Sequence, residues 1–177
     1  MDDEIELRYR RPEMCDTDAL YTQKNDPIVV RTLGGFSNGY SRPEIEQWIR
    51  RVQTASSDVI FSICVPVDEC IGHLGFYEID HRVRSAEFGI MIGARGHWGR
   101  GVGKRSVRWA LDYGFGELAL HRIRLTVLAS HEPAIKLYLG CGFTIEGRHR
   151  DVQWRAGKWH DSLSMSILED DWRCGAG

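Results

Sequence analysis

A glycine-rich segment, His97-Trp98-Gly99-Arg100-Gly101-Val102-Gly103-Lys104, constrains the fold more than any other stretch of this chain. It follows a predicted strand over residues 86–92 and precedes a predicted amphipathic helix that reaches to about Leu118. Glycines let a backbone turn sharply and approach a ligand closely, and the first N–H groups of a helix have no partner within the helix. The segment therefore predicts a strand-to-helix turn suited to an anion, a pyrophosphate in particular.

The spacing of these glycines differs from that of two common nucleotide-binding loops. A P-loop requires GxxxxGK followed by Ser or Thr, and the dinucleotide fingerprint requires GxGxxG; the segment matches neither. Arg100 and Lys104 can add charge-assisted contacts to a phosphate. Taken alone, so short a motif favours an ordinary glycine-rich turn. The rest of the sequence is needed to distinguish such a turn from an anion-binding one.

Hydrophobic periodicity predicts an α/β (α+β) layer packing with a largely antiparallel sheet. Helices are expected to begin near Asp16, after the capping box of Ser41 and Glu44, at the glycine-rich segment and near Pro133. Residues 31–40 predict a loop, and Ala156-Gly157 predicts the turn of a final hairpin. Strands are expected over residues 6–9, 59–65, 70–79, 86–92, 122–128, 143–154 and 159–168.

The composition is that of a globular protein. With 177 residues, 42% of them hydrophobic, we expect a single domain over residues 1–177 that ends in a short loose tail. The formal charge of −2 comes without a basic stripe for nucleic acid or a membrane surface, and no apolar run is long enough to cross a bilayer. The acidic start, five cysteines without CxxC spacing and scattered histidines predict a reduced cytoplasmic protein with no metal site.

The glycine-rich segment is one of several short motifs that follow one another along the chain. They are Gly89–Gly93, Trp98–Gly103, Leu111–Phe115, Leu120–Ile123, Ala134–Tyr138, Gly142-Phe143, Glu146–Arg148 and Gly157–Asp161. Through these motifs the chain from Glu87 to Trp172 resembles the GNAT superfamily, and within it the branch of Rim-type ribosomal-protein N-acetyltransferases and spermidine acetyltransferases. The N-terminal half agrees more loosely. The resemblance implies the GNAT fold: a mixed, mostly antiparallel sheet of six to seven strands, splayed between the fourth and fifth strands and flanked by about four helices.

The resemblance also implies where a cofactor, acetyl-coenzyme A, would lie. Its pantetheine arm would occupy the splay, which is expected to separate Gly89–Ile92 from Arg124–Leu128, and the loop Trp98–Lys104 would hold the pyrophosphate. The predicted cofactor-binding residues are Ile90, Met91, Ile92, Trp98, Gly99, Arg100, Gly101, Val102, Gly103, Lys104, His131, Lys136 and Tyr138.

Two residues are predicted to be catalytic. Tyr138 stands where the family has its general acid, and a phenol near the sulfur can protonate or hydrogen-bond a departing thiolate. The alternative is an aromatic packing residue on a short helix. Glu87 opens the strand beside the expected reaction centre and can take the amine's proton, directly or through water. Its alternative is a sheet-face carboxylate paired with an arginine.

Two positions depart from the commonest family pattern. His131 stands where the family commonly has Asn; it can supply one donor or acceptor, handle a proton, or lie exposed at a helix entrance. Trp98 replaces the Gln or Arg of many members, but Trp is frequent in the Rim-type branch.

The acceptor amine is expected to bind between the segment 31–40, with Tyr40, and the final hairpin. There Glu87, His160 and Asp161 are candidate contacts, and Asp161 has the alternative of a solvated charge. The predicted activity is transfer of an acetyl group to a primary amine by direct attack in a ternary complex. Polyamines, antibiotics, amino-acid derivatives and protein N-termini all remain open as acceptors, and a homodimer is compatible with the resemblance. Alternatives are an acyl-coenzyme A-binding module without turnover and an enzyme that uses another acyl donor.

Overall fold

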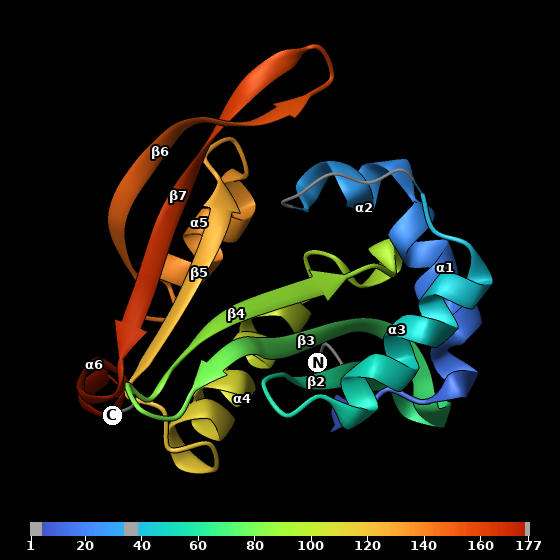
Figure 1. Ribbon diagram of the computed structural model, residues 1–177, viewed down its shortest axis with the longest axis horizontal. Helices are drawn as coiled ribbons and strands as arrows, with labels where there is room; N and C mark the ends of the chain where they lie inside the picture. The colour runs from blue at the N-terminus through green and yellow to red at the C-terminus, as the bar shows by residue number, and fades with distance from the viewer. Residues whose placement is uncertain (1–4, 34–38, 176–177) are drawn as a thin grey trace.

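The computed structural model describes residues 5–33 and 39–175 and contains one seven-stranded sheet (Figure 1). Its strands lie in the order β1-β2-β3-β4-β5-β7-β6, and each neighbouring pair is antiparallel except β4 with β5. The predicted mixed, mostly antiparallel sheet is therefore confirmed. The strands are β1 (Arg8–Arg10), β2 (Val59–Val65), β3 (Glu69–Asp80), β4 (Ser85–Ile92), β5 (Arg122–Leu128), β6 (Thr144–Arg155) and β7 (Lys158–Leu168).

Helices cover both faces of the sheet. The described residues form α1 (Thr17–Asn25), α2 (Pro27–Thr32), α3 (Arg42–Thr54), α4 (Val102–Gly116), α5 (Glu132–Leu139) and α6 (Glu169–Gly175). Helix α4 packs on one face through a large apolar cluster, and α1 and α3 pack on the other through a smaller one. Short 3₁₀ turns lie at Met14–Asp16, Pro66–Asp68 and Arg95–His97.

The predicted start of α3 is confirmed by a reciprocal capping box. The Ser41 hydroxyl accepts from the Glu44 backbone N–H, and the Glu44 carboxylate accepts from the Ser41 backbone N–H at 2.6 Å. The final hairpin is also confirmed: Ala156 and Gly157 have φ of 48° and 77°, as a two-residue turn between twisted strands requires.

Two short helices were not predicted. Helix α2 begins at Pro27 because the Asp26 carboxylate accepts from the backbone N–H groups of Ile28 and Val29. The expected loop over 31–40 therefore begins only after Thr32, and its residues 34–38 lie outside the described part of the chain. Helix α6 replaces the expected loose tail as far as Gly175.

Helix α6 is held to the body of the protein by a side-chain contact. The Trp172 indole N–H donates to the Asp112 carboxylate of α4 at 3.1 Å. No helix in the described ranges is long and apolar enough to span a membrane. Among those same residues, no three or more His, Cys, Asp or Glu side chains are grouped for a metal ion.

Gly114 lets α4 approach the sheet closely. A Cβ at this position would lie 2.8 Å from Ile123 Cδ1 and 2.9 Å from Phe76 Cζ. We expect Gly114→Ala to lower the free energy of unfolding by about 1–2 kcal/mol, because the overpacking exceeds the helix propensity that alanine adds. Gly116→Ala on the same helix meets nothing within 4 Å and is the matched control, expected to be neutral or stabilising in urea denaturation.

Candidate active site

Strands β4 and β5 pair over only part of their length. Three residues of β4, Ser85–Glu87, face Arg122–Arg124 of β5 in parallel register. The remainder of β4, to Ile92, and of β5, to Leu128, has no such pairing, and the two strands diverge in Figure 1. The expected splay is thus present, but it begins at Leu125, because Arg124 is still paired with Glu87.

A cavity of about 1050 Å³ lies where the two strands diverge. Its wall combines both strands with the glycine-rich segment, the start of α5, and parts of α1, β3 and the chain around α2. The structure therefore brings together residues that are far apart in the sequence. The predicted site residues that line it are Tyr40, Glu87, Ile90, Met91, Ile92, Trp98, Gly99, Gly101, Val102, Gly103, His131 and Tyr138.

The glycine-rich segment leaves the cavity wall open where it turns into α4. Gly99 and Gly101 have φ of 72° and 75°, a left-handed conformation that glycine adopts without strain, and a Cβ on either would meet nothing within 4 Å. Gly101 precedes the helix without a side-chain cap. The first N–H groups of α4 are therefore available to an anion, and the helix dipole favours one there. These features fit a pyrophosphate.

Trp98 fixes the segment to the end of β4. Its indole N–H donates to the Ile92 carbonyl oxygen at 2.7 Å. Three predicted phosphate contacts lie elsewhere: Arg100, Lys104 and Lys136 do not line the cavity. Lys136 instead lies 3.9 Å from the Glu132 carboxylate on the exposed side of α5.

Tyr138 projects from α5 and is buried, with 8% of its surface exposed. Its ring packs edge-on against Phe143 at 5.6 Å between centroids. Burial, with a smaller contribution from Cys141, raises the pKa of Tyr138 to about 12. The phenol therefore keeps its proton at neutral pH, as a group that donates a hydrogen bond must. It also packs like a core residue, so its geometry is compatible with both of the roles predicted from the sequence.

The comparisons with known proteins agree with this architecture. The family profile described as Acetyltransferase (GNAT) domain matches residues 6–144. The chain belongs to this family. It is 33% identical to the uncharacterized N-acetyltransferase p20 of Bacillus licheniformis over 169 residues, 94% of each chain. It is 39% identical to a Vibrio cholerae spermidine N(1)-acetyltransferase over 99 residues, 56% of this chain and 57% of that one.

A solved structure extends the likeness over nearly the whole chain. The spermidine N-acetyltransferase of Vibrio cholerae, in complex with CoA and spermine, superposes with a TM-score of 0.87 at 28% identity. The match covers 97% of this chain and 99% of that one. The chain is thus a GNAT N-acetyltransferase, and a structural neighbour of this fold binds CoA.

Glu87 lies at the inner end of the paired part of β4. Its carboxylate is 3.6 Å from the Arg124 guanidinium, which also donates to Glu78 at 2.5 Å. Glu87 thus combines both sequence interpretations: it lines the cavity of this GNAT protein and it is paired with an arginine. Its distance from the guanidinium leaves its oxygens open to a further partner.

His131 is the residue before α5 and lines the cavity. It makes no side-chain capping bond to the helix, and burial lowers the pKa of its imidazole. A neutral imidazole offers one donor and one acceptor. The exposed helix-entrance interpretation is therefore not favoured at this position.

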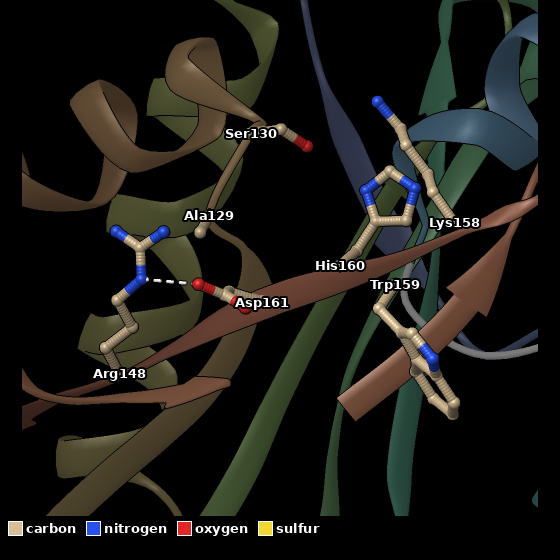
Figure 2. Close-up of a pocket in the computed structure, with 7 residues that line it drawn as sticks. All are labelled: Ala129, Ser130, Arg148, Lys158, Trp159, His160 and Asp161. Atoms are coloured by element: carbon tan, nitrogen blue, oxygen red, sulfur yellow. Dashed lines mark hydrogen bonds and ion pairs between the residues drawn. The ribbon is translucent and has the colours of Figure 1, made fainter. Parts of the chain in front are cut away.

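His160 and Asp161 line a different, smaller cavity of about 290 Å³, shown in Figure 2. The Asp161 carboxylate accepts from the Asp151 backbone N–H at 3.0 Å and from Arg148 Nε at 2.7 Å, and these bonds, the first more than the second, lower its pKa. Asp161 is thus already engaged within the β6–β7 hairpin. A part for these two residues in acceptor binding stays a prediction, and their position outside the large cavity does not support it.

Sequence reasoning did not single out two further residues of the large cavity, Lys24 of α1 and His73 of β3. The local pattern of neither differs from an ordinary helix or strand, since their meeting depends on the packing of α1 and α3 on the sheet. Lys24 lies over the rings of Tyr40 and Trp48, and the His73 ring meets Trp48 edge-on at 5.1 Å.

The Trp98 bond yields a prediction for this GNAT loop. Trp98→Phe keeps an aromatic ring but removes the N–H that holds the loop to Ile92. We expect the KM for acetyl-CoA to rise about three- to tenfold, the value of one neutral hydrogen bond, with kcat nearly unchanged. Initial rates at varied acetyl-CoA measure this. Trp154→Phe, on the exposed hairpin, is the matched control, and equal KM values for the two variants would contradict the assignment.

Proposed function

We propose that this protein transfers the acetyl group of acetyl-CoA to a primary amine, by direct attack within a ternary complex. The observation that supports it best is the single cavity that joins three features: the open N-terminus of α4, the splay of β4 from β5, and the buried phenol of Tyr138. The glycine-rich segment would hold the pyrophosphate, and the unpaired edges of β4 and β5 would hydrogen-bond the pantetheine amides like an added strand.

Acetyl-CoA supplies an activated thioester when it is bound. In the proposed reaction a C–N bond forms and the C–S bond breaks, while the amine loses a proton and the sulfur gains one. Glu87 would accept the amine's proton, directly or through water. Tyr138 would donate its hydrogen bond to the sulfur as negative charge develops there. Its raised pKa favours the protonated phenol that this role requires.

The acceptor is a primary amine, on a small molecule or at a peptide N-terminus. The relatives named for spermidine make polyamines the first compounds to test. A second candidate function, acyl-CoA binding without turnover, rests on His131 in place of the common Asn. Both Tyr138, which is buried, and Glu87, which is partly exposed, line the cavity, and this favours turnover instead.

The test is thiol release from acetyl-CoA with a panel of polyamines, aminoglycosides, amino acids and N-terminal peptides, with products identified by mass. A gain of one acetyl group on one class of amine is the expected result. Binding of acetyl-CoA without thiol release for any amine would favour the binding module. Absence of acetyl-CoA binding in calorimetry would overturn the proposal.

A further inference from the structure

A partly buried cation, Lys24, lines the large cavity on the side of the sheet that α1 and α3 cover. Lys24 Nζ lies 4.7 Å from the centroid of the Trp48 ring and 5.4 Å from that of Tyr40. In the described part of the chain, no carboxylate lies within ion-pair distance of this ammonium group. Two aromatic faces stabilise the charge in part. A cation so placed can still gain from an anion.

The cation lies on the same face of the sheet as Glu87, because Trp48 contacts both Lys24 and the His73 ring. His73 is paired with Met91 and Tyr77 with Glu87 across β3 and β4, so these four side chains share one face. His73 is 8% exposed and, within the described residues, its Nδ1 has no hydrogen-bond partner. Burial and the charge of Lys24 hold the pKa of His73 well below its ordinary value, so the imidazole is neutral.

The charges near Lys24 favour an anion over a cation. Burial, followed by the charge of Arg51, lowers the pKa of Lys24 to about 8. The ammonium form still predominates at pH 7, and an anion would stabilise it. The two carboxylates of the cavity wall, Glu78 and Glu87, both lie against Arg124 and are partly neutralised. A polyamine would be repelled by the Lys24 charge, and the described lining offers it no carboxylates other than Glu78 and Glu87.

A hydrogen bond joins two segments of the chain beside this part of the cavity. The Arg155 guanidinium of the β6–β7 hairpin donates to the carbonyl oxygen of Leu33, just after α2. Leu33 and its neighbour Thr32 line the cavity, as does Tyr40. This bridge joins the two sides of the acceptor end, which suits a small molecule better than an extended protein segment.

We propose that Lys24 binds a carboxylate of the acceptor, so that the substrate is a small amine that carries a carboxylate rather than a polyamine. His73 lies beside the carboxylate and offers a neutral hydrogen-bonding partner. The amine end points toward Glu87. Glu87 lies four residues along β4 from Met91, the partner of His73, and four residues of a strand span about 13 Å. Amino acids, ω-amino acids and dipeptides cover the separations of amine and carboxylate that this span allows. The inference rests on the proposed acetyl transfer.

The first experiment compares each carboxylate with its own carboxamide. Amino acids, ω-amino acids of increasing length and dipeptides are assayed for thiol release beside their amides, with spermidine and C-terminally amidated peptides in the same panel. For the accepted compound, we expect kcat/KM to be about ten- to a hundredfold higher than for its amide, the value of a charge-assisted hydrogen bond. Each pair differs in the carboxylate alone, so the ratio isolates that group.

Two variants then assign the preference to Lys24. Lys24→Met keeps an unbranched chain against Tyr40 and Trp48 but removes the charge, and its carboxylate-to-amide ratio should fall to near one. Lys24→Arg should retain most of the ratio. Arg50→Met removes one positive charge from the exposed side of α3, where Arg50 pairs with Glu46, and should keep the full ratio. A ratio that survives Lys24→Met would overturn the assignment even if carboxylates are preferred.

A binding measurement makes the inference independent of turnover. The chain has four lysines, Lys24, Lys104, Lys136 and Lys158, so lysine-labelled protein yields few ε-CH₂ resonances, and Lys24→Arg identifies one of them. With CoA bound, the carboxylate compounds should shift the Lys24 resonance and their amides should not.

Two further outcomes would contradict the inference, and a third would contradict the acetyltransferase proposal on which it rests. Acetylation of spermidine or an amidated peptide in preference to every carboxylate would overturn it and leave the acetyltransferase proposal standing. The inference would also be overturned if no carboxylate compound shifted the Lys24 resonance, whether or not thiol is released. Failure to bind acetyl-CoA would overturn the acetyltransferase proposal itself.

Discussion

Gly101→Glu is expected to abolish the binding of acetyl-CoA. Gly101 has a φ of 75° and open space beside it, at the residue before α4. A glutamate there would place a negative charge where the pyrophosphate is proposed to lie. Two like charges 4 Å apart at the surface repel by about 4 kcal/mol, so affinity should fall on the order of a thousandfold. Isothermal titration with acetyl-CoA measures the loss directly.

Two controls separate charge from backbone strain. Gly101→Ala places a residue with a Cβ in the left-handed conformation but adds no charge. It should weaken acetyl-CoA binding about tenfold. Gly157→Glu adds the same side chain at a φ of 77°, also with open space, in the hairpin turn. It should leave acetyl-CoA affinity unchanged. Wild-type affinity in Gly101→Glu would show that the pyrophosphate does not lie at this loop.

The success of sequence reasoning on the fold has a local cause. The capping box of Ser41, the Ala156-Gly157 turn and the glycine-rich segment each act over a few residues, so the sequence predicts them directly. Helix α2 carried an equally local signal, Asp26 followed by Pro27, but its six residues are too few for a hydrophobic period. Helix α6 was not predicted because it follows the last strand without a turn residue.

The candidate site also has one side that local sequence signals predict and one side that they do not. Its cofactor side consists of contiguous motifs, and most of their residues line the cavity. Its acceptor side is assembled from α1, β3 and the chain around α2, and depends on strand register and helix packing. A lysine on α1 is typical of an exposed helix face, and the position of Lys24 over two aromatic rings follows only from the packing. Asp161 shows the same dependence on packing, since the sequence does not reveal that this carboxylate is bonded to Arg148.

Tyr138→Phe is the prediction that tests the chemistry rather than the binding. Phenylalanine keeps the ring that packs on Phe143 but removes the hydroxyl, so the protein should fold as before. If the phenol donates to the sulfur, kcat should fall about a hundredfold while acetyl-CoA affinity stays within about a factor of two. Steady-state rates together with calorimetric titration separate these two effects.

The pH profile and a matched variant complete the argument for Tyr138. Burial raises its pKa to about 12, so the proton-bearing form persists and wild-type activity should show no loss through Tyr138 ionisation below about pH 11. Tyr113→Phe removes a phenol hydroxyl from α4, away from the cavity, and should leave kcat unchanged. Equal turnover in Tyr138→Phe and Tyr113→Phe would assign Tyr138 to packing alone. The departing thiolate would then take its proton from solvent.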